Sequence, residues 1–391
     1  MERDELAAWL RLTLTPGIGN GRARKLLAAF GLPQAIFEQS DTGLRQVVTP
    51  AQAQALRSPP AELANLVDHT WQWLQSSQPG HPARRLATLG DAHYPPALLN
   101  LDDPPLLLYL LGNAVFGNAG DGTADPADLR IDPARSLAVV GRPHPTPPGA
   151  AHARLFSRAL AQAGLTVVSG LALGIDAAAH EGALDAIDDQ TSHGATVAVV
   201  GTGLDRVYPK AHRDLAHRIA RHGLLVSEYP LGTPPLTANF PKRNRLIAGL
   251  AQGTLVVEAA LKSGSLISAR LSAEQGKEVF AVPGSIHAAQ SRGCHALIKQ
   301  GAKLVESAQD VLEELKWPLT QPGLPPAAAA QTPAADTADG LLTALGFDPV
   351  GLDALQARTG WPTADLQAQL MTLEIDGHIA RLPGGLFQRQ A

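Results

Sequence analysis

The chain has 391 residues, of which 45% are hydrophobic, so it is too long for one ordinary core and too apolar to be wholly disordered. Its formal net charge of −4 excludes a uniformly basic coat for nucleic acid, and any anion-binding surface must be local. The single cysteine, Cys294, excludes an internal disulfide framework. No signal peptide or bilayer-spanning run is evident, which predicts a soluble, cytoplasmic protein without membrane insertion.

Residues 1–80 are predicted to form a first, all-helical domain. Its expected helices lie at 5–12, 22–30 and 61–75. The Gly-rich turn at 15–21 is typical of helix-hairpin-helix or SAM-like domains. Two interpretations of this turn stay open: its amides and the cations that follow contact a phosphate, or the glycines only make a tight turn between helices.

Residues 82–316 alternate short β-branched runs with helical segments. The runs occupy 136–141, 165–170, 195–201, 224–228, 254–258 and 278–283, and helices are expected at 152–163 and 212–222. This alternation predicts an α/β domain with a doubly wound, mostly parallel sheet. In such sheets the binding sites lie at the carboxyl ends of the strands, where these runs end in Gly, Ser, Pro or Glu.

Two further segments follow the sheet domain. Residues 318–337 are rich in Pro and Ala and are predicted to be a linker. Residues 338–391 have the order of a winged-helix domain, with a third helix at 363–376 and a hairpin around 383–385. That helix carries three acidic residues and no lysine or arginine, and acid opposite phosphate is repulsive. We therefore expect a protein contact or a regulatory role for this domain.

A basic cluster at 242–245 stands close to a Ser/Gly turn at 263–265. Lys242, Arg243 and Arg245 precede an apolar strand, and the strand leads to the turn, which opens a helix. Cations beside a helix N-terminus favour phosphate. No catalytic set accompanies the cluster, so the stretch indicates binding of a phosphate backbone rather than chemistry on one.

The remaining motifs give weak signals for chemistry. Asp176 and His180 follow a Gly-rich strand-to-helix turn, and for His180 we favour internal packing. The glycines at 201 and 203 begin a dinucleotide fingerprint, but Arg206 occupies its third position. No P-loop and no metal-ligand spacing occur, so the sequence predicts no cofactor, no metal and no enzyme activity.

Several charged residues lie near these turns in the sequence. Arg213, Arg218 and Arg221 are interpreted as a solvated helix face, whereas Arg206 and Lys210 lie at the strand edge and are better candidates for a site. Glu258 ends its strand near the expected pocket. It could act as an acid or base, or it could orient Arg243 or Arg245 by an ion pair, and we favour the ion pair.

Taken in order, these motifs resemble the DNA-processing protein A family (DprA, also called Smf). The matching blocks are 94–95, 105–109, 169–180, 203–205, 208–209, 227–230, 240–249, 263–269 and 282–284. The resemblance implies an extended Rossmann-like domain that binds single-stranded DNA. It also implies a homodimer that loads the recombinase RecA during natural transformation and DNA recombination.

Carried over residue by residue, the resemblance implies a set of DNA contacts. Those expected to touch DNA are Lys210, Lys242, Arg243, Asn244, Arg245, Ser263, Gly264 and Ser265. The turns at Gly170 and Gly203 are expected to shape the pocket. The family usually has Val-Gly-Ser-Arg after the first strand of the sheet, and that arginine grips DNA. Here Arg142 takes the serine position and Pro143 the arginine position, so either Arg142 reaches the same phosphate or the contact is weakened.

Two other functions stay open. Residues 253–258 resemble a block of the nucleotide N-glycoside hydrolases of the lysine-decarboxylase-like family, which would make the chain an enzyme. That family's preceding Pro-Gly-Gly is missing here, and the run at 240–245 has no place in it. The other alternative is an interaction scaffold with a vestigial pocket, for which the change at Arg142 and Pro143 leaves room.

Overall fold

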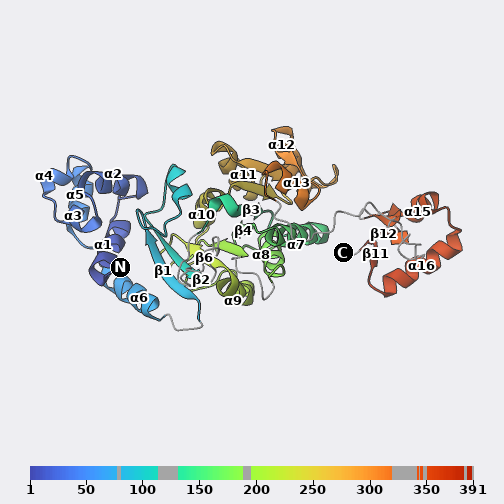
Figure 1. Ribbon diagram of the computed structural model, residues 1–391, viewed down its shortest axis with the longest axis horizontal. Helices are drawn as coiled ribbons and strands as arrows, with labels where there is room; N and C mark the ends of the chain where they lie inside the picture. The colour runs from blue at the N-terminus through green and yellow to red at the C-terminus, as the bar shows by residue number, and fades with distance from the viewer. Residues whose placement is uncertain are drawn as a thin grey trace. The chain divides into compact units, whose positions relative to one another are not determined.

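The computed structural model describes residues 1–76, 81–112, 131–187, 195–318, 341–342, 344–346, 350–382 and 385–389. The chain forms two compact units, Met1–Trp317 and Pro318–Ala391 (Figure 1). Each unit has its own buried core. The predicted domain boundaries near residues 80 and 82 lie inside the first unit and stay a prediction.

Within residues 1–76 the first unit forms six helices. They are α1 (Arg3–Leu14), α2 (Asn20–Phe30), α3 (Pro33–Phe37), α4 (Asp41–Leu44), α5 (Pro50–Arg57) and α6 (Leu63–Gln75). Trp9, Leu26 and Leu56 come from different helices and are buried together. The helical character of this segment is confirmed, but the sequence did not indicate α3, α4 and α5, which are short. Side chains cap two of them: Ser40 caps α4, and Thr49 forms a capping box at α5.

A single sheet forms the centre of the first unit, and its strands in the described residues follow the order β1-β2-β6-β5-β4-β3-β7-β8-β9. Their bounds are β1 (Ala83–Thr88), β2 (Leu107–Gly112), β3 (Ser136–Val140), β4 (Thr166–Ser169), β5 (Thr196–Val199), β6 (Leu224–Ser227), β7 (Gly253–Val256), β8 (Glu278–Ala281) and β9 (Lys303–Leu304). In the part of this order that runs from β6 through β5, β4, β3, β7 and β8 to β9, neighbouring strands pair in parallel. Strand β2 pairs antiparallel with both β1 and β6. The predicted mostly parallel sheet is confirmed.

Helices cover both faces of the sheet because its strands are apolar on both sides. The covering helices are α7 (Pro147–Gln162), α8 (Ile175–Leu184), α9 (Arg213–His222), α10 (Asn239–Gly249), α11 (Ser265–Glu274), α12 (Arg292–Lys299) and α13 (Ala308–Glu314). On β3, Val139 packs in a core with Phe156 of α7, while Val140 packs in another with Leu246 of α10. Alternate residues of one strand thus serve opposite faces.

The order of the strands reverses at β3, which has β4 on one side and β7 on the other. The chain runs outward from β3 through β4, β5 and β6, and then returns through α10 to β7. Such a reversal leaves a crevice at the carboxyl ends of the strands, where ligands bind in open α/β sheets. Short 3₁₀ turns complete the unit at η1 (Pro96–Asn100), η3 (Pro133–Arg135), η4 (Lys210–His212) and η5 (Ala289–Ser291).

The second unit has the elements of a winged helix. Its described elements include β10 (Val350–Gly351), α15 (Leu352–Thr359), α16 (Thr363–Ile375), β11 (Ile379–Leu382) and β12 (Leu386–Arg389), with strand order β10-β12-β11. Leu355, Leu366 and Phe387 lie in its core. The expected third helix is therefore confirmed as α16, and the expected hairpin as β11 and β12. The linker predicted at 318–337 lies, except for residue 318, outside the described residues.

Candidate nucleic-acid interface

A cavity of about 390 Å³ opens at the carboxyl ends of the parallel strands. Its walls come from the turns after β3, β4 and β5, from α10, and from the turn that opens α11. Among the described residues that line it are Gly141, Pro143, Gly170, Leu171, Asp176, Gly201, Tyr208, Phe240, Arg243, Asn244, Ser263, Gly264, Ser265 and Ser268. The cavity therefore lies in the crevice that the reversal of strand order creates.

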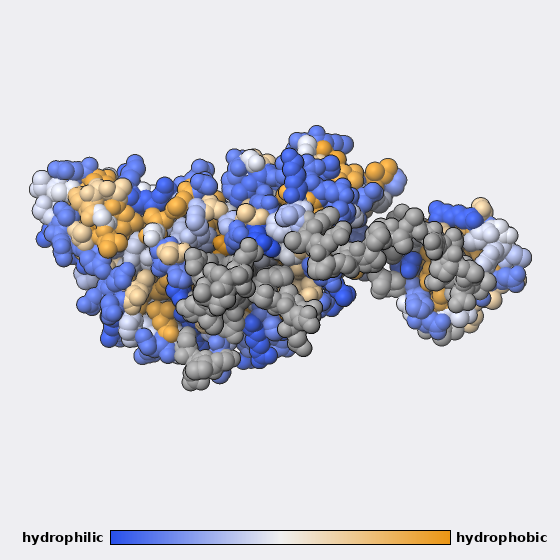
Figure 2. Space-filling model, in the orientation of Figure 1, coloured by the Kyte–Doolittle hydropathy of each residue, from blue (hydrophilic) through white to orange (hydrophobic). Residues whose placement is uncertain are grey.

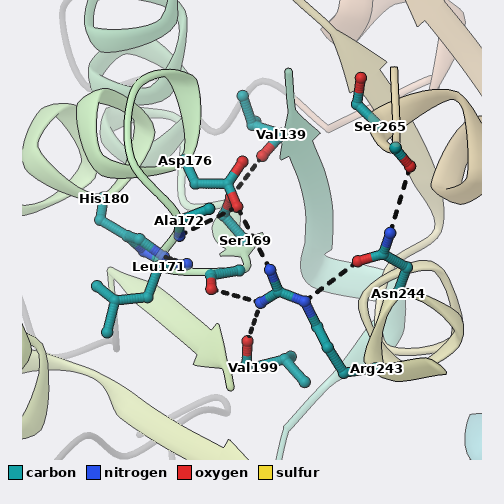
Figure 3. A network of polar contacts seen from close by, with 12 residues as sticks. Val139, Ser169, Leu171, Ala172, Asp176, His180, Val199, Arg243, Asn244 and Ser265 are labelled. Carbon is teal, nitrogen blue, oxygen red and sulfur yellow. Dashed lines mark hydrogen bonds and ion pairs between the residues drawn. The ribbon is translucent and has the colours of Figure 1, made fainter. Parts of the chain in front are cut away.

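Arg243 forms part of the cavity wall and is only 5% exposed. Its Nη1 donates to the carbonyl oxygens of Gly170 and Val199, and its Nε donates to Asn244 Oδ1 at 3.1 Å. Its Nη2 lies 3.8 Å from Asp176 Oδ2. Figure 3 shows the guanidinium between Val199, Asn244 and Asp176. Arg243 thus links the ends of two strands, β4 and β5, to helices α8 and α10, and its charge is compensated inside the protein.

The carboxylate that compensates Arg243 is buried as well. Asp176, near the N-terminus of α8, is 6% exposed and accepts a hydrogen bond from the Ala172 amide at 3.4 Å. Burial raises the pKa of Asp176, and the Arg243 guanidinium opposes that shift. The pair therefore presents little net charge to the cavity.

His180 lies behind the cavity wall and is fully buried. Its Nε2 accepts from the Leu171 amide at 3.3 Å (Figure 3). Its Nδ1 lies 2.7 Å from Thr196 Oγ1, which in turn donates to the Val167 carbonyl. This pattern fits a neutral ring with its proton on Nδ1. Burial, with help from Arg243, lowers the pKa of His180 to about 3. His180 packs internally, as the sequence indicated.

Gly170 has a clear physical reason to be glycine. A Cβ built there would overlap the Arg243 guanidinium, because the arginine lies directly against the Gly170 backbone. Gly203 is buried in the turn after β5, where a Cβ would stand 2.5 Å from Asp205 Oδ1 and 2.7 Å from the Pro230 carbonyl oxygen. Gly203 is not among the described residues of the cavity lining, so it fixes the turn rather than the cavity itself.

The basic cluster at 242–245 does not act as one surface, because it lies on α10 and neighbouring helical residues point about 100° apart. Lys242 is exposed outside the cavity lining. Arg245 also lies outside the lining: it is ion-paired with Glu228, and Asp103 stands 4.0 Å away. Burial raises the pKa of Glu228, against the influence of Arg245. Of the three cations only Arg243 reaches the cavity.

Arg142 is held by Glu258. Its Nη1 lies 3.5 Å from Glu258 Oε1, and the same carboxylate accepts from the Thr146 amide at 3.2 Å and from Thr146 Oγ1 at 2.6 Å. The expected pairing of Glu258 with Arg243 or Arg245 is therefore wrong, since those arginines pair with Asp176 and Glu228. Pro143 is among the described residues that line the cavity, whereas Arg142 is not.

The turn that opens α11 supplies hydroxyl groups to the cavity. Ser263 Oγ and Ser265 Oγ are 2.7 Å apart, and Asn244 Nδ2 donates to the Gly264 carbonyl at 3.3 Å. The amides of residues 265–267 all donate within the turn. With these amides already bonded, the helix N-terminus offers serine hydroxyls together with the helix dipole.

Two aromatic residues on the cavity wall, Tyr208 and Phe240, were not predicted from the sequence as site residues. The rings of Tyr208 and Phe240 have centroids 5.6 Å apart and are tilted by 38°. Tyr208 is 46% exposed. Both residues belong to blocks of the family resemblance. The blocks are separate in the sequence, and nothing in them predicted that the two rings would be in contact. Lys210, the first residue of η4, lines a neighbouring groove instead.

Other features of the described residues bear on function. No group of three or more His, Cys, Asp or Glu side chains in this part of the chain is placed to hold a metal ion. No helix there is long and apolar enough to span a bilayer. On the face seen in Figure 2, hydrophilic residues cover most of the first unit.

Comparison with known proteins identifies the family. The model of DNA recombination-mediator protein A matches residues 85–316, and the DprA winged helix domain matches residues 325–385. Protein Smf of Escherichia coli is 41% identical over 320 residues, which cover 80% of this chain and 78% of that protein. Protein Smf of Synechocystis is 32% identical over 426 residues, with both chains covered completely.

A solved structure agrees with these matches. The DNA processing protein A of Streptococcus pneumoniae has a TM-score of 0.62 and 33% identity, covering 80% of this chain and 98% of that one. The family match spans the whole parallel sheet and every residue of the cavity lining named above. The chain therefore belongs to the DNA recombination-mediator protein A family.

Proposed function

We propose that this chain binds single-stranded DNA in the cavity at the strand ends and assists the recombinase RecA, as a homodimer in the cytoplasm, in natural transformation and DNA recombination. The observation that carries the proposal is the composition of the cavity. It has an aromatic pair on one wall, serine hydroxyls on another and a neutralised ion pair between them. An unstacked base needs an aromatic or apolar face, and a sugar-phosphate needs hydrogen-bond donors.

A duplex fits this cavity poorly. Its bases are paired and stacked, so their faces are not available to Tyr208 and Phe240. A volume of about 390 Å³ admits single nucleotides rather than a double helix. Membership of a family of DNA recombination mediators supports a nucleic acid as the ligand.

The residues divide into two roles in this proposal. Those that contact DNA are Lys210, Lys242, Asn244, Ser263, Gly264 and Ser265. Those that shape the site are Arg142, Gly170, Gly203, Arg243 and Arg245, whose contacts are made within the protein. Within this set of residues the two lysines are the cations available for phosphate, because both are exposed and neither has an ion pair in the described part of the chain.

The glycoside-hydrolase alternative loses its main residue. Glu258 would have to face a nucleotide, but it accepts hydrogen bonds from Thr146 and pairs with Arg142 outside the described cavity lining. The carboxylate that does line the cavity, Asp176, is paired with Arg243. We therefore propose a binding function without catalysis; release of free base from nucleoside monophosphates would contradict it.

The test is a titration of labelled oligothymidylate and of a blunt duplex, followed by fluorescence anisotropy at several salt concentrations. We expect the single strand to bind at least tenfold more tightly than the duplex. Lys242→Ala should lower the salt slope by about 0.7, the value for one phosphate contact on a single strand. Lys299→Ala, an exposed lysine on α12 away from the cavity, is the matched control and should leave the slope unchanged. Equal affinity for single strand and duplex would refute the proposal.

Assistance to RecA needs its own assay. Single-stranded DNA coated with a single-strand binding protein slows the DNA-dependent ATPase of RecA, and we expect this chain to relieve that lag. Sedimentation of the full chain should give the mass of a dimer, twice 40.9 kDa. An unchanged lag at saturating protein would remove the RecA part of the proposal, while a monomer mass would remove the dimer.

A further inference from the structure

A second hollow, here called the basic groove, lies beside the cavity in the first unit. It encloses about 1290 Å³ between the end of α6, strand β1, the turn after β5, and α9. Lys210, Arg213, His217 and Arg221 line it from η4 and α9. Of the proposed DNA contacts, Lys210 alone among the described residues lines this groove.

The groove concentrates positive charge in a chain whose net charge is −4. Five arginine or lysine side chains line it in the described residues, against one carboxylate, Asp205. That carboxylate is already used: it pairs with Arg206 at 3.0 Å and accepts from the Gly232 amide at 2.8 Å. Arg84 is likewise held, over the Trp73 ring at 5.5 Å.

The cations on α9 are arranged along one face. Arg213, His217 and Arg221 are spaced four residues apart, so they lie in a row on the side of α9 that faces the groove. All three are exposed, and neither arginine has an ion pair among the described residues. Arg218 of the same helix points elsewhere and lies 3.6 Å from Asp185. The solvated helix face expected from sequence thus divides into a paired side and an unpaired side.

The groove adjoins the cavity. Leu171, Val200 and Tyr208 line both hollows. A strand that leaves the cavity past Tyr208 therefore meets Lys210 and then the row on α9. Arg213 and Arg221 are about 12 Å apart along the helix axis, which matches about three phosphates of a stacked strand.

We propose that the basic groove binds the phosphates of the strand segment adjacent to the one held in the cavity. This proposal rests on the proposed function, because it takes the same strand as its ligand. The groove increases the affinity for strands long enough to reach it, whereas a short strand is bound by the cavity alone. Its contacts are made to phosphate, so they are independent of base sequence.

The test compares two lengths of oligothymidylate, about 6 and about 24 nucleotides, chosen below and above a single-module site. The variant is Arg213→Ala/Arg221→Ala in the full chain. The matched control is Arg154→Ala/Arg218→Ala, which removes two exposed arginines that both pair with Asp185 outside the groove. Anisotropy at several salt concentrations gives affinities and salt slopes, and thermal melting checks that both variants remain folded.

We expect the groove variant to weaken long-strand binding at least tenfold and to reduce the salt slope by about 1.4, for two phosphates. Short-strand affinity should stay within twofold, and the control should match the unmodified protein. Long-strand binding equal to that of the control would overturn the groove proposal, as would equal weakening of both lengths. If the unmodified protein fails to bind the short strand, the cavity proposal falls alone, since the long strand still reports on the groove.

Discussion

The cavity and the basic groove share a wall but hold their charges differently. Among the described residues that line the cavity, the arginine is Arg243, which is 5% exposed and faces Asp176. In the groove, Arg213 and Arg221 are exposed and have no ion pair in the described part of the chain. A buried charge is costly to move, whereas an exposed one exchanges counterions freely. We therefore expect Arg243 to set the shape of the site, and the groove arginines to set the affinity for DNA and its salt dependence.

The largest effect should come from Arg243. In Arg243→Met the Asp176 carboxylate stays buried without its partner, which costs about 3–5 kcal/mol of unfolding free energy. Lys242→Met is the matched control, because the neighbouring lysine is exposed and should change stability by less than about 0.5 kcal/mol. Urea unfolding followed by tryptophan fluorescence measures both. A stable Arg243→Met protein that only binds DNA less well would show that Arg243 is a DNA contact after all.

A second comparison uses two glycines of the same cavity. Gly170→Ala places a methyl group on the Arg243 guanidinium, and we expect a loss of about 1–3 kcal/mol from overpacking. Gly264→Ala is the control, because a Cβ built there has nothing within 4 Å. The two urea midpoints should differ clearly. Equal midpoints would mean that Arg243 can leave its place without cost.

The residues at 242–245 show which features of the site could be predicted from the sequence and which could not. It placed the cluster and the Ser263–Ser265 turn in one neighbourhood, and residues of both segments line the cavity. It did not separate Lys242, Arg243 and Arg245, since that requires knowing that α10 turns them toward solvent, Asp176 and Glu228 respectively. Ion pairs between segments so distant in sequence depend on packing, and no local pattern reports them.

The sheet was easier to predict than its edges. Strands β3 to β8 are continuous apolar runs between helices, which is the pattern of a parallel sheet covered on both faces. Strands β1 and β2 pair antiparallel at one edge, and β9 has two residues at the other, so they lack that pattern. The basic groove depends on the edge formed by β1 and β2, because Arg84 of β1 lines the groove together with residues of α9. Its existence could not be predicted from α9 alone.

The wall behind the cavity should respond to acid. The pKa of His180 is lowered from 6.5 to about 3, so between these values the unfolded chain binds a proton that the folded chain does not. Stability from this residue is therefore lost as the pH falls below 6.5, by about 2 kcal/mol at pH 5. His180→Asn retains a donor and an acceptor but does not titrate. Its urea midpoint should fall less than that of the unmodified protein between pH 7 and pH 5; an identical fall would contradict the assignment.

The smallest expected effect lies at the shared wall. Tyr208→Ala removes a ring that is 46% exposed, while Phe240 keeps one aromatic face in the cavity. We expect affinity for single strands to fall about fivefold, near 1 kcal/mol, the lower end for loss of one stacking ring. Tyr208→Phe keeps the ring and should bind normally. Tyr208 lines both hollows, and in the proposed path every bound strand passes it, so binding of short and of long oligothymidylate should weaken by the same factor. The groove variant weakens only the long strand, so a Tyr208→Ala protein that behaved in that way would assign the ring to the groove instead of the cavity.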